Sequence, residues 1–360
     1  MNNKIMAVVA VVIIVVAGLG IAYILTRDDG GTDGNTIIDA RGREVTVPEE
    51  INSILAIKSC SLQLVSFFDA VNKVDHLDIN ESFTDTNRTH TFVLKDLLQG
   101  LPPVDPNDAE QVIMAHPDIV ISSTVSISDL NNEQAKYGVP VFAINADVEY
   151  GSDEMYKQIL ALGELFGEQE RAAEIVDGIK TFIGDIEGNV SSVSGMNAYA
   201  CGMNFYGAAQ TPFLRASGDY LPFEYSKVSN IYPSVTGGQP YDTDIETLIS
   251  KNPNIIFIDG IGLASSIDYI NANKVSLSMV DAISNDNIYK VLVYKMWGTN
   301  WVNLLINVYY VASIVHDGEF SWTFDDKANE IIQLFYPGTS VTYSDLAAAQ
   351  SGGGCGKVTL

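Results

Sequence analysis

Residues 152–188 contain the long helical segment that most constrains how this chain can fold. Apolar residues recur through it at helical spacing, and Gly163 and Gly167 mark a break that divides it into two helices. The second helix, predicted over residues 168–187, is about 30 Å long at 1.5 Å per residue. The sequence on either side of this segment indicates what the helix connects.

The same sequence joint stands before and after the helical segment. Residues 108–121 and 244–257 each read Asp-x-Glu, six residues, Pro, Asp or Asn, and then a short apolar run. This pattern is typical of a short capped helix that ends at proline and leads into a buried strand. Such joints are common in α/β proteins in general. One in each half of the chain favours two similar lobes connected by the long helix.

Apolar runs alternate with helical segments through both halves, and this predicts an α/β fold of two Rossmann-like lobes with parallel sheets. Residues 36–48 alternate apolar and polar residues around Arg41-Gly42, which predicts a β-hairpin. The first lobe is predicted to have strands at 54–57, 74–77, 119–121 and 139–144, and the second at 197–201, 255–258 and 288–294.

The N-terminal residues predict a membrane anchor. Residues 5–25 carry no charge and are long enough to span a bilayer as a helix, whereas a secretory apolar region is usually about 7–15 residues long. A removed signal peptide is the alternative. Lys4 precedes the span and Arg27 is outweighed by two aspartates, so the positive-inside rule places the body outside the cell.

These features divide the chain into six parts. We predict an N-terminal transmembrane helix at 1–27, a linker at 28–36, the N-terminal lobe at 37–151, connecting helices that include the bridging helix at 152–188, the C-terminal lobe at 189–338 and a flexible Gly-rich tail at 339–360.

The charge of the chain excludes one class of partner. The formal net charge is -25, so the protein lacks the basic surface that nucleic acid requires, and electrostatic docking on anionic lipid is disfavoured as well. The three cysteines, Cys60, Cys201 and Cys355, are too few for a disulfide framework, and the four histidines show no metal-ligand spacing. We therefore expect neither a cofactor nor a bare metal site.

Several motifs, taken in order, resemble the substrate-binding proteins of iron-siderophore, haem and corrinoid ABC importers. They are DARGREVTVP at 39–48, HPDIVISS at 116–123, GVPVFAI at 138–144, ALGELFGEQERAAEIV at 161–176, NPNIIF at 252–257 and NIYKVLVYKMWGTNW at 287–301. The resemblance covers about residues 36–338. It implies two lobes joined by one rigid helix, a ligand held between them, and a permease dimer with its ATPase as partner. The anchor lacks a lipidated cysteine and looks archaeal.

The candidate ligand site lies in the loops that follow the strands, because open parallel sheets bind ligands outside the carboxyl ends of their strands. From the first lobe the candidates are Lys58, Ser59, Cys60, Ser61, Ser122 and Ser123. From the second they are Met203, Asn204, Phe205, Tyr206, Tyr241, Asp259, Trp297 and Trp301.

The composition of these loops favours a large, mostly neutral ligand. Aromatic side chains suit a flat corrinoid or the apolar rim of an iron-siderophore, although ordinary core packing is the alternative role for each of them. An anionic chelate would require several arginines, whereas the loops offer Lys58, Lys295 and Arg215. Cys60 and Cys201 are either soft ligands to a bound metal complex or buried thiols.

The resemblance also implies a role for Glu110 and Glu246, which occupy the same place in the two joints. The matching glutamates of the family dock onto the two permease subunits, one for each lobe. The alternative is a capping charge, because an acidic residue near a helix N-terminus is stabilised by the helix dipole.

We therefore predict a tethered, extracellular binding protein that delivers a metal chelate to an ABC importer. An anchored sensor or ligand store without a transporter is one alternative. A cell-surface enzyme is another, although the sequence contains no nucleophile elbow, P-loop, HExxH motif or Rossmann glycine fingerprint. Unaltered release of the bound chelate separates a binder from an enzyme.

Overall fold

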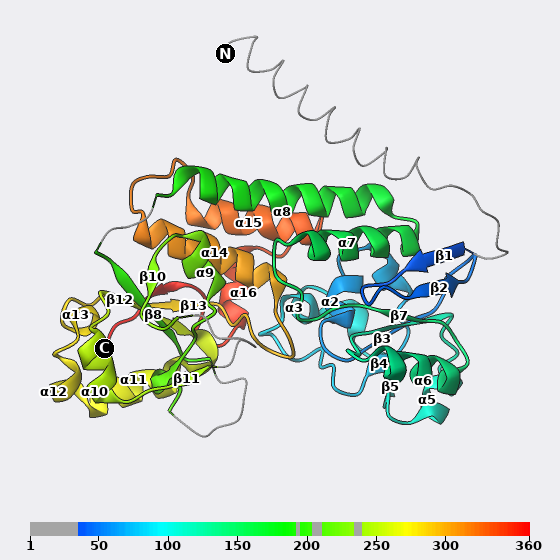
Figure 1. The fold of residues 1–360 in the computed structure, drawn as a ribbon, viewed down its shortest axis with the longest axis horizontal. Helices are drawn as coiled ribbons and strands as arrows, with labels where there is room; N and C mark the ends of the chain where they lie inside the picture. Colours follow the sequence, from blue (N-terminus) through cyan, green and yellow to red (C-terminus); the bar gives the residue numbers. More distant parts are fainter. Residues whose placement is uncertain (1–34, 192–194, 204–210, 234–239) are drawn as a thin grey trace, which may run out of the picture.

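Two lobes lie side by side in the computed structural model, and one long helix runs across both (Figure 1). The structure describes residues 35–191, 195–203, 211–233 and 240–360. The predicted anchor, residues 1–27, falls outside these ranges. Within them no helix combines the length and apolar character needed to cross a membrane.

The N-terminal lobe contains a parallel sheet and a hairpin. Its central sheet has the order β3 (Ile54–Ile57), β6 (Ile119–Ser122), β7 (Val141–Ala143). The predicted hairpin is formed by β1 (Asn35–Ile38) and β2 (Glu44–Val47), and β4 (Leu77–Asp78) pairs with β5 (Pro103–Val104). The helices are α2 (Ser61–Val65), α3 (Thr89–Val93), α4 (Lys95–Leu98), α5 (Ala109–Met114) and α6 (Ile127–Tyr137), with a 3-10 turn at Asp69–Lys73.

The C-terminal lobe is built on β8 (Asn197–Cys201), β12 (Ile255–Asp259) and β13 (Ile288–Val291), which are parallel, and β10 (Ser229–Asn230) pairs with β8. The strands β9 (Arg215–Ala216), β11 (Tyr241–Asp242) and β14 (Gly356–Lys357) add antiparallel edges to the predicted parallel sheet of this lobe. The helices are α9 (Leu221–Tyr225), α10 (Ile245–Lys251), α11 (Leu263–Ala272), α12 (Lys274–Leu277), α13 (Asp281–Ser284), α14 (Trp301–Val315), α15 (Phe324–Phe335) and α16 (Tyr343–Ala349), with 3-10 turns at Pro212–Leu214 and Gly260–Gly262.

Two helices, α7 (Asp153–Phe166) and α8 (Gln169–Asn189), form the predicted connection between the lobes. Gly167 ends α7 in the left-handed region at φ 73°, and the amide of Glu168 donates to the carbonyl of Gly163 at 2.7 Å. A side chain would not fit at Gly163, because a Cβ there would lie 2.3 Å from the Cβ of Ala172. Glycine at this position therefore lets α7 and α8 approach closely.

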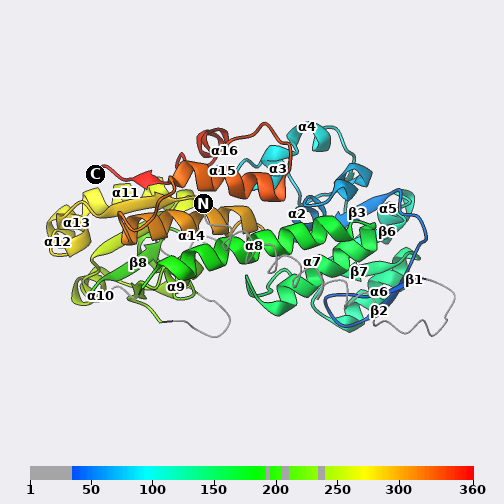
Figure 2. The same cartoon turned by 90° about the horizontal axis from the view of Figure 1, so that it is seen from above.

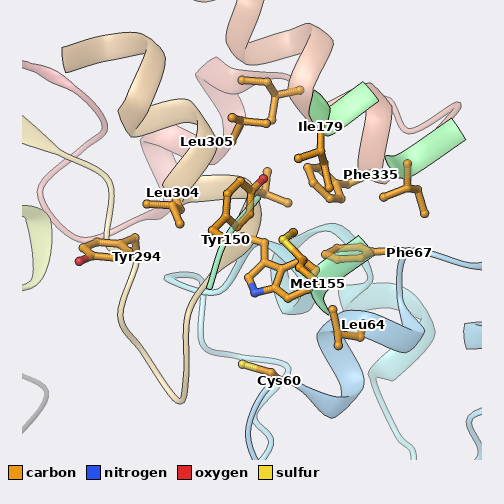
Figure 3. Packing of buried hydrophobic residues seen from close by; sticks show 14 of the residues in the cluster. Cys60, Leu64, Phe67, Tyr150, Met155, Ile179, Tyr294, Leu304, Leu305 and Phe335 are labelled. Atoms are coloured by element: carbon orange, nitrogen blue, oxygen red, sulfur yellow. The ribbon is translucent and has the colours of Figure 1, made fainter. Parts of the chain in front are cut away.

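A hydrophobic core that is continuous between the lobes supports this connection. The ring of Phe67, which follows α2, lies 4.6 Å from the ring of Phe335 at the end of α15 and 6.1 Å from Trp301. Tyr150 meets Trp301 edge-on at 5.9 Å. Figure 3 shows Phe67, Tyr150 and Phe335 converging in this core with Met155 and Ile179. Helix α15 thus carries apolar side chains of the second lobe back to the first.

The C-terminal residues do not form the loose tail that the glycine-rich sequence predicts. Thr342 and Asp345 form a capping box at the start of α16, and β14 adds an antiparallel strand to β13. Gly352, Gly353 and Gly354 adopt positive φ values of 81°, 70° and 79°. These glycines therefore make a tight ordered turn, and the prediction of a flexible tail at 339–360 is wrong.

Candidate functional site

The strand ends of the N-terminal lobe carry a closed polar network. The Lys58 ammonium pairs with Glu133 and also donates to the Thr124 hydroxyl. The Ser122 hydroxyl donates to Glu133 at 3.1 Å. Asp78, at the end of β4, accepts from the backbone N–H of Lys58 at 2.6 Å. Because Glu133 neutralises the Lys58 charge, this lysine is a poor anchor for an anionic ligand.

The remaining N-terminal candidates differ in exposure. Ser59 is half-buried, whereas Ser61 is fully buried and Ser123 is only 8% exposed. Lys58 and Cys60 both adopt positive φ, at 65° and 64°, which turns the chain sharply from β3 into α2. The partly exposed Lys58 and Ser59 are therefore the members of this loop best placed to meet a ligand.

Cys60 is buried at the junction between the lobes. Its thiol lies 3.7 Å from the Thr299 carbonyl, and a Cβ on Gly298 would lie 2.3 Å from its sulfur. Burial raises the pKa of the thiol to about 12, so Cys60 stays protonated at neutral pH. Cys201 is buried in the core of the C-terminal lobe, where burial also raises its pKa. Both environments favour the buried-thiol interpretation over a soft metal ligand.

Gln63, which the sequence analysis did not select, fixes the loop between β13 and α14. Its Nε2 donates to the Thr299 carbonyl at 2.8 Å, and its Oε1 accepts from the backbone N–H of Trp301 at 3.0 Å. Gln63 belongs to the N-terminal lobe and is only 2% exposed. One buried amide therefore positions a loop of the opposite lobe.

This loop presents Trp297 to solvent. The amide of Met296 donates to the Gly298 carbonyl at 3.0 Å, and the amide of Asn300 donates to the Tyr294 carbonyl at 2.7 Å. Trp297 adopts φ 53° at the tip of the resulting turn and is 42% exposed. It is the only aromatic side chain classed as exposed within the described ranges. A rigid turn beside the other lobe thus holds an indole in contact with water.

Three other C-terminal candidates are interior residues. Trp301 is 1% exposed in the interlobe core, and Met203 is 2% exposed in the same core. Asp259 is also 2% exposed. Burial raises the pKa of its carboxyl to about 7, although hydrogen bonds from the backbone N–H groups of Ile261 and Tyr294 act to lower it. Their placement at strand ends is as predicted, but packing keeps them away from a ligand between the lobes.

The last predicted residues lie at the edge of the second lobe or outside the described ranges. Tyr241 is half-buried on β11, where its ring lies 5.1 Å from that of Tyr232. Asn204, Phe205 and Tyr206 lie outside the residues that the structure describes.

The basic residues near the site do not form an anion-binding cluster. Arg215 is buried and lies 4.0 Å from the Asp242 carboxylate. Lys295 donates to the Thr299 hydroxyl at 2.9 Å, and burial lowers the pKa of its ammonium group. No group of three or more His, Cys, Asp and Glu side chains in the described part of the chain could hold a metal ion.

Glu110 and Glu246 occupy equivalent, exposed positions in the two lobes. Each lies in the first turn of a short helix, α5 or α10, on the side of the molecule away from α8 (Figure 1). The caps are Asp108, which accepts from the Glu110 amide at 3.0 Å, and Asp244, which accepts from the Thr247 amide at 2.7 Å. Neither glutamate carboxylate forms a hydrogen bond or ion pair with another described residue. The aspartates therefore supply the capping that was the alternative role of the glutamates.

Replacing the two tryptophans separates a ligand contact from a packing residue. Trp301→Ala should lower the free energy of unfolding by about 3–5 kcal/mol, because it empties a buried site. Trp297→Ala should change stability much less but weaken binding of the cognate ligand by roughly 1–3 kcal/mol. Denaturant unfolding and ligand titration measure the two effects. Trp297→Phe is the control that keeps an aromatic ring, and unchanged affinity of Trp297→Ala would contradict the ligand contact.

Comparison with known proteins agrees with this architecture. An uncharacterized ABC transporter substrate-binding lipoprotein of Bacillus subtilis is 24% identical over 163 residues, 44% of this chain and 48% of the relative. The chain thus matches about half the length of that relative.

Solved structures share the fold over most of the chain. A molybdate-bound periplasmic binding protein of Haemophilus influenzae has a TM-score of 0.65 at 19% identity, covering 86% of this chain and 99% of its own. A nickel–histidine complex of a Helicobacter pylori protein has a TM-score of 0.63 at 16% identity, covering 85% and 96%. The family model described as periplasmic binding protein matches residues 61–291. Since this match spans well over half of the 360 residues, the chain belongs to the periplasmic binding protein family.

Proposed function

We propose that the protein captures a metal chelate between its two lobes and delivers it to an ABC importer. The observation that carries this proposal is Trp297, which a rigid turn holds 42% exposed beside the junction of the lobes. An indole held in a fixed turn at this place has a large apolar face and a polar N–H with which to contact a ligand. Membership of a binding-protein family supports the same role.

The surroundings of Trp297 favour a large chelate with little net negative charge, such as a corrinoid or a hydroxamate-type iron-siderophore. Glu133 neutralises Lys58, and Arg215 is buried beside Asp242. One exposed indole beside neutralised or buried cations suits an apolar ligand rim better than a ferric catecholate or citrate. The molybdate and nickel–histidine complexes with this fold contain ligands of other kinds, so the ligand class rests on the residues of this chain.

We also propose that the body is extracellular and tethered by residues 5–25. This uncharged run is long enough to span a bilayer, and the B. subtilis relative is named a lipoprotein, which is a tethered type of protein. Tethering keeps a loaded binding protein near its transporter and so raises its effective concentration there. A sensor or store without a transporter is the alternative function.

A binding screen tests capture directly. The chain from residue 35 to residue 360, which keeps the ordered C-terminal segment, is titrated with cobalamin, haem, ferric hydroxamates and ferric catecholates. Tryptophan quenching and a melting shift report binding, and mass analysis of the released ligand reports any chemical change. We expect saturable binding of a neutral chelate, released unaltered. Turnover of the ligand, or binding of catecholates alone, would contradict the proposal.

Glu110 and Glu246 are the residues proposed to dock on the permease. Each is exposed in the first turn of its helix, and the aspartate before it already supplies the cap. An importer with two related permease subunits would require such equivalent contacts, one on each lobe. Rim charges of this kind set encounter and register rather than folding.

Reversing both charges should therefore uncouple delivery from capture. The double variant Glu110→Lys, Glu246→Lys should bind chelate with wild-type affinity but fail to stimulate the ATPase of the reconstituted importer. The matched control is Glu154→Lys, Glu170→Lys, because these exposed glutamates occupy the first turns of α7 and α8 on the opposite side of the molecule. Full stimulation by the first variant, or equal loss in the control, would remove the two residues from the docking site.

A further inference from the structure

We propose that the C-terminal segment, residues 343–358, is a clasp that holds the two lobes at a fixed angle. This segment, here called the clasp, comprises α16, the glycine turn and β14. It lies outside residues 61–291, the part matched by the family model. In Figure 2, α16 lies beside α3 of the N-terminal lobe, and α15 lies between it and α8. The clasp is therefore attached away from the axis of the bridging helix.

The clasp is anchored to the C-terminal lobe along one strand and one turn. β14 pairs with β13, and the amide of Val358 donates to the Ile288 carbonyl at 2.9 Å. The Lys290 ammonium donates to the carbonyls of Gly352 and Gly353, the latter at 3.1 Å. The strand pairing and the Lys290 bonds together couple the clasp to the C-terminal lobe.

The same clasp is also bonded to the N-terminal lobe. The Thr86 hydroxyl donates to the Ala349 carbonyl at 2.6 Å, and the amide of Ser351 donates to the Asn87 side chain at 2.8 Å. Both partners belong to the loop at residues 79–88, which leads from β4 into α3. Two directional bonds therefore cross from one lobe to the other through the clasp.

Asn303, a buried residue of α14, forms hydrogen bonds to the clasp, to α3 and to the segment that follows β13. Asn303 is fully buried, and its Nδ2 donates to the Gln350 side chain at 3.0 Å and to the Val293 carbonyl at 2.7 Å. Its Oδ1 accepts from the Thr89 hydroxyl at 2.6 Å. Leaving a buried polar group without a hydrogen-bond partner costs free energy. Separating the lobes at this point would remove the partners of several such groups at once.

The loop that the clasp holds is itself stiff and reaches the candidate site. Arg88 is buried and pairs with Glu81 at 2.6 Å and with Asp85 at 3.0 Å. At the base of this loop Asp78 accepts from the Lys58 amide, at the strand end that carries Lys58 and Ser59. A change in the clasp can therefore reach the N-terminal side of the ligand site through ordered, bonded residues.

The mechanical consequence follows from the positions of the attachments. The bridging helix resists bending, and the shared core and the bonds from Gln63 to the Thr299 carbonyl and the Trp301 amide restrain rotation of the lobes about its axis. The clasp adds a further attachment away from that axis, which opposes rotation as well. The clasp thus keeps the Trp297 turn and the Lys58 loop in register, whichever ligand the protein binds.

Releasing either end of the clasp tests this inference in the full chain. Thr86→Val with Asn87→Ala breaks the bonds to the N-terminal lobe, and Lys290→Met weakens the anchor on the C-terminal lobe. Single-molecule energy transfer between dyes at exposed positions 136 and 274, one in each lobe, reports the lobe separation. Ketone-bearing residues carry the dyes, so the native thiols stay unlabelled. Both variants should populate a second separation, with the ratio of open to closed molecules raised by a factor of about 5–30.

Thr84→Val is the matched control, because Thr84 lies in the same loop and its exposed hydroxyl bonds only to Ser82 among the described residues. It should leave the separation unchanged. Melting curves recorded in parallel separate stability from geometry. Variants that melt earlier but keep the wild-type distribution of separations would overturn the inference and reduce the clasp to a stabilising segment.

Discussion

The contact of Phe67 with Phe335 and Trp301 is the interaction on which the rest of this structure depends. It places one aromatic ring of the N-terminal lobe against two of the C-terminal lobe. Arg171 of α8 strengthens the same junction by donating to the Phe67 carbonyl at 3.0 Å and the Phe335 carbonyl at 3.1 Å. Apolar burial shared in this way makes the two lobes one packed body rather than two domains on a linker.

The candidate site follows from this shared core. Because the lobes are already joined, strand ends from both can meet at fixed distances, and the buried amide of Gln63 can hold the turn that carries Trp297. Gly298 allows that turn to lie against Cys60. Affinity is gained when binding groups are held in place before the ligand arrives, since less ordering is then required on binding. A rigid two-lobed body therefore suits capture of a bulky ligand with small lobe movement.

Much of the fold could be predicted because local sequence and tertiary structure agree. The strand at 197–201 occurs with the predicted bounds, and the hairpin and the repeated joints are present. The tail was mispredicted because glycine repeats in a flexible linker and in a tight turn look alike in sequence. Only pairing with a distant strand, β13, distinguishes the two.

The site could be predicted less well than the fold. Strand ends locate a loop but not the direction of its side chains, so Trp297 and Trp301 looked equivalent although one is exposed and the other fills the core. Gln63 and Glu133 carry no local signal, because their importance comes from partners far away in the chain. The polar segment before α3 likewise gave no indication that it bonds to the C-terminal segment.

Calorimetry tests most directly whether the lobes share one core. A single cooperative unit should unfold in one transition, with a calorimetric enthalpy equal to the van't Hoff enthalpy. We expect this result for the purified protein, with both lobes unfolding at the same temperature. Two resolved transitions, one for each lobe, would contradict the shared core and with it the rigid body proposed to carry the ligand.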